Sequence, residues 1–146
     1  MESGVANGVS TFFILNALSK NGNGSLVSID ITDDVATFLT DEEKKRWRLK
    51  VIDIRHNPRK QFQKIMDEAA SLSIYIHDGD HSYTWQTMEY YAALKKLKAG
   101  GLLFSDDIDS SYAFIDVCGN KGKYTDISLK GILVGQSKIF GYARKT

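Results

Sequence analysis

The stretch that best indicates the type of fold is residues 72–107, which read LSIYIHDGDHSYTWQTMEYYAALKKLKAGGLLFSDD. The near-continuous apolar run at 72–76 predicts a buried strand. The apolar residues within 84–98 recur at helical spacing and a pair of glycines follows them, which predicts a helix that stops there. A second apolar run then ends in two aspartates and predicts another strand. A strand, a helix and a strand in this order are typical of a parallel α/β unit.

The same alternation extends over the rest of the chain. Patterns upstream predict a helix at 9–20, a strand at 25–30, amphipathic helical turns within 33–47, a strand at 48–54 and a helix at 58–70. Two β-like runs downstream, at 123–129 and 132–143, predict an antiparallel hairpin around Lys130 and Gly131. The expected fold class is therefore α/β, with a mostly parallel central sheet, helices on both faces and a C-terminal antiparallel hairpin.

Composition narrows the class of protein. The chain has 146 residues, of which 42% are hydrophobic and 25% charged, so one globular domain is expected. Its formal net charge of +1 argues against a dedicated nucleic-acid binder. The single cysteine, Cys118, cannot form an internal disulfide and favours a reducing, cytoplasmic location. No apolar run approaches the roughly 18 residues that span a bilayer, so no membrane partner is expected.

Polar residues gather where the predicted strands end. They are a glycine loop at 4–8, Asp30, a loop at 78–81, and the pair Asp106 and Asp107. In open α/β sheets, ligands bind beyond the carboxyl ends of the strands. The positions of these residues therefore predict a ligand site at that edge of the sheet.

The opening segment, ESGVANGVS at residues 2–10, is a candidate binding loop. Gly4 and Gly8 would let backbone amides approach a ligand closely, and the helix that follows would favour a negative group such as a carboxylate. The spacing matches neither the dinucleotide-binding pattern G-x-G-x-x-G nor the phosphate-binding pattern G-x-x-x-x-G-K-[ST]. An ordinary tight turn accounts for the two glycines about equally well.

Asp30 is a candidate ribose ligand. It stands at the end of a predicted strand that follows the glycine loop, where an acidic residue commonly bonds the two hydroxyls of a nucleoside ribose. The alternative role is that of a helix N-cap, which Asp33 or Asp34 could fill as well.

The two aspartate-rich strand ends predict a cation site. Neighbouring strands would bring Asp78, Asp106 and Asp107 together, and their charges would raise one another's pKa unless a cation neutralised them. A hard divalent ion with oxygen ligands, most plausibly Mg²⁺, would do so. Zinc is disfavoured because only His77 and His81 offer nitrogen nearby. The alternative is that these acids are hydrated caps of the following helices.

A general base is expected in the loop that follows residue 77. His81 is the candidate general base, with Asp80 as its alternative or its orienting partner. A loop histidine that only bonds the backbone is the competing interpretation. His77, directly after the apolar strand, is expected to be structural, and Tyr83 could touch a ligand.

Together these features resemble the class I S-adenosylmethionine-dependent methyltransferases. The closest resemblance is to O-methyltransferase-like members that open on E-x-G-x-x-x-G-x-S-T and carry a D-G-D-H-S-Y loop. The matching residues are Glu2, Gly4, Gly8, Ser10 and Thr11, then 78–83, then LKAGGLLFSDD at 97–107. The resemblance covers residues 2–142. It implies a Rossmann-like methyltransferase fold in a single domain, 1–146, that lacks the usual N-terminal helices.

The resemblance also implies roles for individual residues. Gly4, Gly8 and Ser10 would surround the methionine part of the cofactor, Glu2 would lie near its amino group, Asp30 would hold the ribose, and His56 and Asn57 would lie beside the adenine. The segment around His56 departs from the Gly-Asp-Ser-like sequence usual in the family. Asp78, Asp106 and Asp107 would bind Mg²⁺, with Asp78 also counted among the cofactor-binding residues. Asp80 or His81 would be the catalytic base.

The function implied is that of an enzyme that transfers a methyl group from S-adenosyl-L-methionine, to a hydroxyl oxygen of a small molecule, with Mg²⁺ assistance. The expected partner is a small-molecule acceptor, with neither nucleic acid nor membrane, and a homodimer is a possible assembly. The alternative is a non-catalytic cofactor-binding or assembly module that retains the fold. A phosphoacceptor receiver domain would place its acidic pair after the first strand, and a nicotinamide dehydrogenase would carry the glycine pattern that is missing here.

Overall fold

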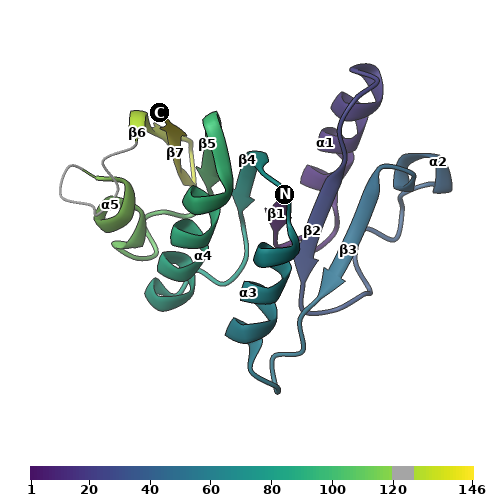
Figure 1. Cartoon of the computed structure of the whole chain (residues 1–146), viewed down its shortest axis with the longest axis horizontal. Coiled ribbons are helices and arrows are strands. Elements are labelled where there is room, and N and C mark those ends of the chain that lie inside the picture. The colour runs from purple at the N-terminus through teal and green to yellow at the C-terminus, as the bar shows by residue number, and fades with distance from the viewer. Residues whose placement is uncertain (120–126) are drawn as a thin grey trace. The chain divides into compact units, whose positions relative to one another are not determined.

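The computed structural model describes residues 1–119 and 127–146 (Figure 1). These residues form two compact units, Met1–Ile65 and Met66–Thr146. Each unit combines β-strands with helices, as the alternating pattern of the sequence predicts. The single domain expected over 1–146 stays a prediction.

The first unit is built on three parallel strands. Its elements are β1 (Glu2–Ser3), α1 (Val9–Lys20), β2 (Leu26–Asp30), α2 (Asp41–Lys44), β3 (Trp47–Val51) and most of α3 (Pro58–Glu68). The strand order is β3-β2-β1, with Ser3 opposite Ile29 and Asp30 opposite Val51. Because the strands are parallel, their carboxyl ends, and the loops that follow them, lie along one edge.

The core of the first unit forms where α1 packs on β2. Its buried residues are Val5, Leu15, Leu26, Val35, Ala36 and Leu39. Gly8, at the start of α1, has a φ of 80°, and a side chain there would place its Cβ 2.3 Å from the Cβ of Ala36. Both the left-handed backbone and this close approach require glycine at position 8.

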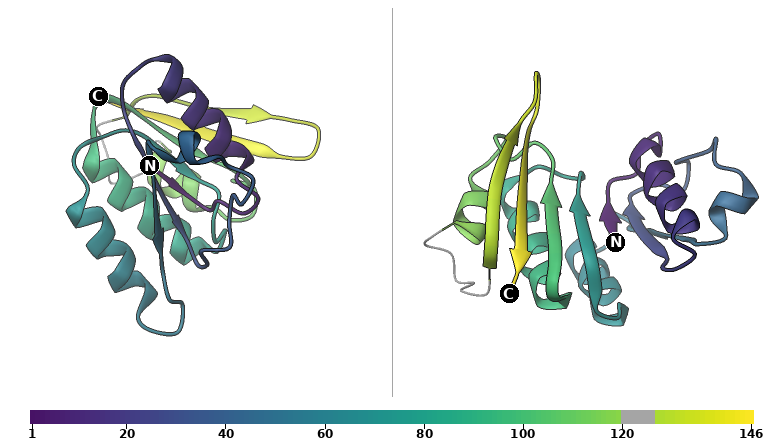
Figure 2. Two further views of the ribbon diagram at one scale, coloured as in Figure 1. Left: turned by 90° about the vertical axis from the view of Figure 1, so that its right-hand side faces the viewer. Right: turned by 90° about the horizontal axis from the view of Figure 1, so that it is seen from above.

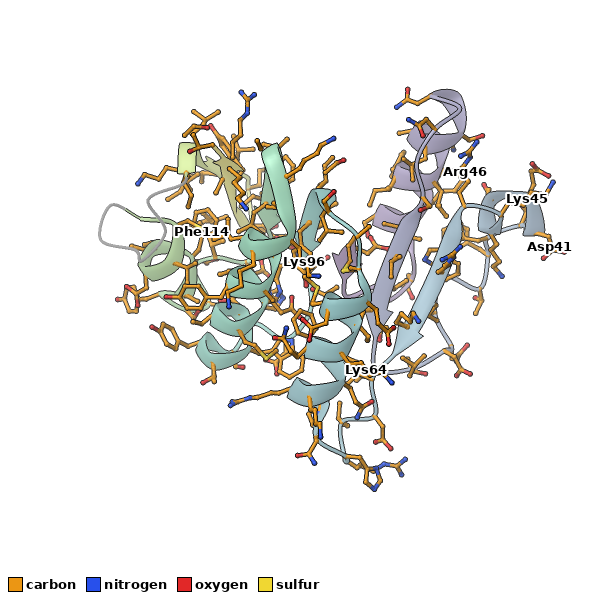
Figure 3. The ribbon with its side chains drawn as sticks, viewed as in Figure 1. Asp41, Lys45, Arg46, Lys64, Lys96 and Phe114 are labelled. Carbon is orange, nitrogen blue, oxygen red and sulfur yellow. The ribbon has the colours of Figure 1, made fainter. Side chains whose placement is uncertain are left out.

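The second unit contains β4 (Leu72–His77), α4 (Tyr83–Lys96), β5 (Leu97–Ser105), α5 (Ala113–Cys118), β6 (Ile127–Val134) and β7 (Ile139–Lys145). β4 and β5 are parallel, whereas β7 is antiparallel to both β5 and β6, so the strand order is β4-β5-β7-β6. Figure 2 shows α4 and α5 beside these strands. Phe114 of α5 (Figure 3) lies against Gly141 of β7, where a Cβ would come within 2.6 Å of the ring.

The predicted fold class is confirmed, but the turn of the hairpin is not where the sequence places it. The chain turns at 135–138, where the backbone N–H of Gly135 donates to the carbonyl of Lys138 at 2.8 Å. Gly131 lies inside β6 opposite Tyr142, whose hydroxyl would be 2.4 Å from a Cβ at residue 131. Glycine is therefore needed at 131 for cross-strand packing and not for a turn. Residues 123–126 of the predicted run lie outside the described residues.

Two further boundaries differ from the pattern. α4 ends at Lys96, and β5 begins at once at Leu97, before the glycines predicted to stop the helix. Gly100 has a φ of 77°, and Gly101 packs so closely that a Cβ would lie 2.8 Å from the carbonyl oxygen of Lys98. These glycines shape the start of a strand. The short helix α5 has no clear periodicity in the sequence and is not predicted.

Candidate active site

The loop between β1 and α1 is held in an unusual backbone conformation. Gly4, Ala6 and Gly8 have φ values of 82°, 46° and 80°, and a non-glycine residue such as Ala6 rarely adopts such an angle. The N–H of Gly4 donates to the carbonyl of Ile29 at 2.9 Å, and the N–H of Gly8 donates to that of Val5 at 2.7 Å. The loop is thus fixed at the carboxyl end of β1.

Asp30, at the end of β2, bonds this same loop. Its Oδ2 accepts from the N–H groups of Val5 at 2.8 Å and Ala6 at 3.3 Å, and its Oδ1 accepts from the N–H of Ile31 at 2.6 Å. A carboxylate has about four acceptor positions, so roughly one is left for a ligand. Asp30 therefore shapes the glycine loop and still offers acceptor capacity to a hydroxyl group.

Glu2 is buried at the start of β1. Its Oε1 accepts hydrogen bonds from the hydroxyls of Thr11 at 2.5 Å and Ser28 at 2.7 Å, and Ser28 also accepts one from the indole N–H of Trp47. The other oxygen, Oε2, is 3.4 Å from the hydroxyl of Ser10. Glu2 thus joins all three strands of the first unit to α1, and Oε2 keeps capacity for a further donor.

The segment after β3 is organised by Asp53. Its carboxylate accepts from the backbone and guanidinium of Arg55, at 2.9–3.2 Å, and lies 2.8 Å from Nδ1 of His56. These contacts hold the pKa of Asp53 well below its usual range. Asn57 has a φ of 49°, and its carbonyl accepts from the N–H of Gln61 as α3 begins. His56 and Asn57 are therefore exposed parts of a rigid turn at the carboxyl end of β3.

Two exposed isoleucines at these strand ends are missed by the sequence reasoning. Ile31 follows Asp30 and is 62% exposed, and Ile54 follows Asp53 and is 61% exposed. Because β2 and β3 are neighbours, both apolar side chains stand at the same edge of the first unit. In both cases, an apolar residue directly follows an acid at or just beyond a strand end, which is the signal that could have found them.

In the second unit, the structure brings together the three predicted carboxylates, Asp78, Asp106 and Asp107, which form the acidic cluster. Asp78 follows β4 and the other two follow β5, and these parallel strands pair with His77 opposite Ser105. Burial, and next the charge of Asp106, raise the pKa of Asp78 to about 6. The effect expected from the sequence is therefore present at Asp78, whereas the pKa of Asp106 is lowered.

Lys138 neutralises part of the charge of this cluster, a contact that the sequence does not predict. Its ammonium group forms an ion pair with Asp106 and lies 3.7 Å from Oδ2 of Asp107. Burial works against the charged form of Asp106, but hydrogen bonds from Lys138 and from the N–H of Asp107 hold its pKa below the usual value. No local pattern connects residues 106 and 138, because their proximity results from the turn between β6 and β7.

His81 lies at the rim of the acidic cluster. Its Nε2 is 4.0 Å from Oδ1 of Asp78 and 3.8 Å from Oδ2 of Asp107. Asp80, the other candidate base, is exposed and accepts a hydrogen bond from the N–H of Ser82 at 2.8 Å, just before α4 begins. The structure therefore places His81, and not Asp80, beside the carboxylates.

His77 is buried beneath this site, and Glu89 is its partner. The Nδ1 of His77 is 2.6 Å from Oε2 of Glu89, which also accepts from the hydroxyl of Tyr75, while Oε1 accepts from the indole N–H of Trp85. Tyr83 donates to Asp116 of α5 at 2.9 Å. Both His77 and Tyr83 thus make structural contacts, which for His77 is the role expected.

The acidic cluster has the oxygen ligands that Mg²⁺ prefers, but it is not arranged around a metal position. Within 1–119 and 127–146, no group of three or more His, Cys, Asp or Glu side chains is placed to hold a metal ion. The ammonium of Lys138 contacts the carboxylates that would be ligands. The side chains in this arrangement therefore do not fit a bound divalent ion.

Three of the solved structures that resemble this fold are described as methyltransferases or O-methyltransferases. The MycE methyltransferase of the mycinamycin biosynthetic pathway, in complex with Mg and SAH, matches with a TM-score of 0.67 at 18% identity, over 99% of this chain and 43% of that chain. A protein assigned as an O-methyltransferase from Klebsiella pneumoniae matches with a TM-score of 0.74 at 17% identity, over 99% and 71%. An O-methyltransferase from Bacillus cereus in complex with SAH matches with a TM-score of 0.62 at 14% identity, over 99% and 72%. The chain thus spans less than half of the MycE chain.

The fold is that of a Rossmann-like methyltransferase, as the resemblance implies. The chain belongs to the family described as "Methyltransferase domain", whose sequence profile matches residues 1–108. No curated protein matches the chain significantly. In the described part of the chain, none of the helices has the length and apolar character required to cross a membrane.

Proposed function

We propose that this protein transfers a methyl group from S-adenosylmethionine to a hydroxyl oxygen of a small molecule. The observation that carries the proposal is the position of His81, whose Nε2 lies within 4.0 Å of carboxylates from two neighbouring strand ends. Membership of the methyltransferase family supports it. The MycE structure that contains Mg, SAH and mycinamycin VI is a complex with a small molecule, which supports an acceptor of that class here.

The residues of the first unit fit the cofactor. The backbone of the glycine loop and Oε2 of Glu2 would hold the methionine part, with Ser10 beside it. Asp30 would accept a hydrogen bond from a ribose hydroxyl, and Ile31 and Ile54 would cover the adenine ring. When bound, the cofactor supplies a methyl carbon on a sulfonium centre, which is open to in-line displacement.

His81 would act as the base. In its neutral form, Nε2 would take the proton of the acceptor hydroxyl as the oxygen attacks, and the resulting imidazolium would be stabilised by the charges of Asp78 and Asp107. Gln86 of α4 would hold the ring in place, since its side-chain nitrogen lies 3.5 Å from Nδ1 of His81. Holding base and acceptor in near-attack geometry is the main contribution that the protein makes to such a displacement.

Assistance by Mg²⁺ stays a prediction. The chemistry of the acidic cluster supports it, whereas the contacts of Lys138 with Asp106 and Asp107 oppose it. No step of the mechanism above therefore passes through a metal. A homodimer, the absence of nucleic-acid and membrane partners, and a cytoplasmic location also stay predictions.

Calorimetry with S-adenosylhomocysteine tests the cofactor part of the proposal. We expect binding by the unaltered protein and a loss of affinity in Asp30→Asn, because the neutral amide offers fewer acceptor positions to the ribose and the glycine loop. Asp33→Asn, an exposed neighbour in the sequence, is the matched control and should bind as the unaltered protein does. Absence of binding by the unaltered protein would instead favour the non-catalytic assembly module.

A further inference from the structure

We propose that Lys138 is the resident cation of the acidic cluster, and that a divalent metal ion enters this cluster only by displacing the Lys138 ammonium group. The inference concerns Asp78, Asp106 and Asp107 themselves. It does not depend on the cofactor or on the acceptor of methyl transfer.

The first support is the contact geometry. Lys138 forms an ion pair with Asp106 and its Nζ lies 3.7 Å from Asp107, so one ammonium group serves two carboxylates of the cluster. The side chain of Asp106 is only 9% exposed, whereas that of Lys138 is 46% exposed. The charge of Asp106, the less hydrated of the two carboxylates, is therefore stabilised mainly by Lys138 and only slightly by water.

The second support is that the backbone places Lys138 at the cluster. The hairpin turn is closed by the hydrogen bond from the Gly135 N–H to the Lys138 carbonyl at 2.8 Å. The next residue, Ile139, accepts a hydrogen bond from the N–H of Ile108 at 3.0 Å, which ties the hairpin to the segment that follows Asp107. Main-chain hydrogen bonds therefore hold the backbone of Lys138 opposite the carboxyl end of β5.

The third support is the balance of charge. The cluster consists of the carboxylates that follow β4 and β5, and the groups that face it are His81 from the loop before α4 and Lys138 from the turn before β7. Among the described residues, Lys138 is the lysine or arginine that pairs with Asp106 and Asp107. Without the charge of Lys138, the repulsion among the three carboxylates would favour the binding of another cation, and a divalent ion with oxygen ligands suits such carboxylates.

Metal binding must therefore compete with the ammonium group. A metal ion bound by Asp106 and Asp107 would share its ligand oxygens with Nζ of Lys138, and two cations at such short separation repel each other. Because the stem of Lys138 is flexible and half exposed, the ammonium can swing into solvent when a metal ion takes its place.

Titration of Mg²⁺ into the metal-free protein, followed by calorimetry, tests the proposal. The variant Lys138→Met keeps the length of the side chain and removes its charge, so we expect it to bind Mg²⁺ at least about tenfold more tightly than the unaltered protein. Lys138→Arg keeps the charge and should bind Mg²⁺ as weakly as the unaltered protein. Lys98→Met, which removes an exposed lysine from the same unit, is the matched control and should change nothing.

A second measurement guards against a variant that folds poorly. Without metal, Lys138→Met should unfold at a lower temperature than Lys98→Met, and millimolar Mg²⁺ should restore much of the difference, because ligands that bind the folded state raise its stability. Equal Mg²⁺ affinity in Lys138→Met and the unaltered protein would overturn the proposal. So would tight binding by Lys138→Arg, or no detectable binding by Lys138→Met. Since neither cofactor nor acceptor is present, these outcomes leave the proposed methyl transfer untouched.

Discussion

The imidazole Nδ1 of His77 lies 2.6 Å from the carboxylate of Glu89, and neither side chain is exposed to solvent. Glu89 also accepts hydrogen bonds from Tyr75 and Trp85, so it satisfies three donors from β4 and α4 at once. Within this buried pair, His77 directly precedes Asp78 in the chain, and Glu89 lies in α4. The contact between His77 and Glu89 therefore fixes the end of β4, after which Asp78 of the acidic cluster follows.

Replacing Glu89 is expected to destabilise the protein strongly. Glu89→Ala would leave the donors of His77, Tyr75 and Trp85 without their acceptor, which should lower the free energy of unfolding by about 3–5 kcal/mol. Urea denaturation followed by circular dichroism measures this change. The control is Glu42→Ala, whose exposed pair with Lys45 should be worth less than about 1 kcal/mol. Similar losses in the two variants would contradict the role given to Glu89.

Gly8 is expected to tolerate no side chain. In Gly8→Ala the new Cβ would collide with Ala36 in a left-handed backbone, so we expect a loss of about 2–4 kcal/mol of stability together with loss of S-adenosylhomocysteine binding. Gly22→Ala is the matched control, because Gly22 has a φ of 66° but open space around it. That variant should lose only about 1–2 kcal/mol. Equal effects would mean that the contact with Ala36 is unimportant.

Cys118 is expected to be unreactive in the folded protein. Its thiol is buried, and burial raises its pKa to about 12, so very little thiolate exists at pH 8. An aromatic disulfide reagent added at pH 8 should react no faster than the protein unfolds, and it should react completely in concentrated urea. Rapid reaction without denaturant would show that α5 opens far more often than this packing implies.

Asp78 is expected to make stability depend on pH in the acid range. Its pKa is raised from 3.8 to about 6 in the folded state, so the folded protein binds this proton more tightly than the unfolded chain does. The resulting contribution to stability is complete below pH 3.8 and is lost as pH rises through about 6. Asp78→Asn should therefore flatten the stability profile over this window, and Asp109→Asn, an exposed control, should not. Carboxyl NMR should locate the midpoint directly, with Lys138→Met raising it further.

His81 is expected to matter for turnover and little for cofactor binding. If His81 takes the acceptor proton, His81→Gln should lower kcat by about 10²- to 10⁴-fold and leave the affinity for S-adenosylhomocysteine nearly unchanged. Asp80→Asn should have a much smaller effect, because Asp80 bonds the backbone of Ser82. Parallel losses of kcat and cofactor affinity in His81→Gln would show that the ring shapes the binding site and is not the base.

Much of the fold could be predicted because the signals are local. α1 runs from Val9 to Lys20 as its apolar spacing predicts, and the apolar runs before Asp30, Asp78 and Asp106 are strands. The meeting of Asp78 with Asp106 also follows from sequence, since the carboxyl ends of adjacent parallel strands share an edge. The hairpin turn is wrongly placed because glycine marks close packing as well as turns, and Gly131 serves the first purpose.

The sequence by itself therefore determined the class of fold, the methyltransferase family and the strand ends where the candidate site lies, because side-chain periodicity and motif spacing act between neighbours in the chain. Only the tertiary structure decided how the charges are compensated. Glu2 bonds Thr11 and Ser28, and Lys138 reaches Asp106 across 32 residues. Such pairs depend on where strands and turns come to lie in space, and burial then makes each unpaired charge costly enough for the partner to matter.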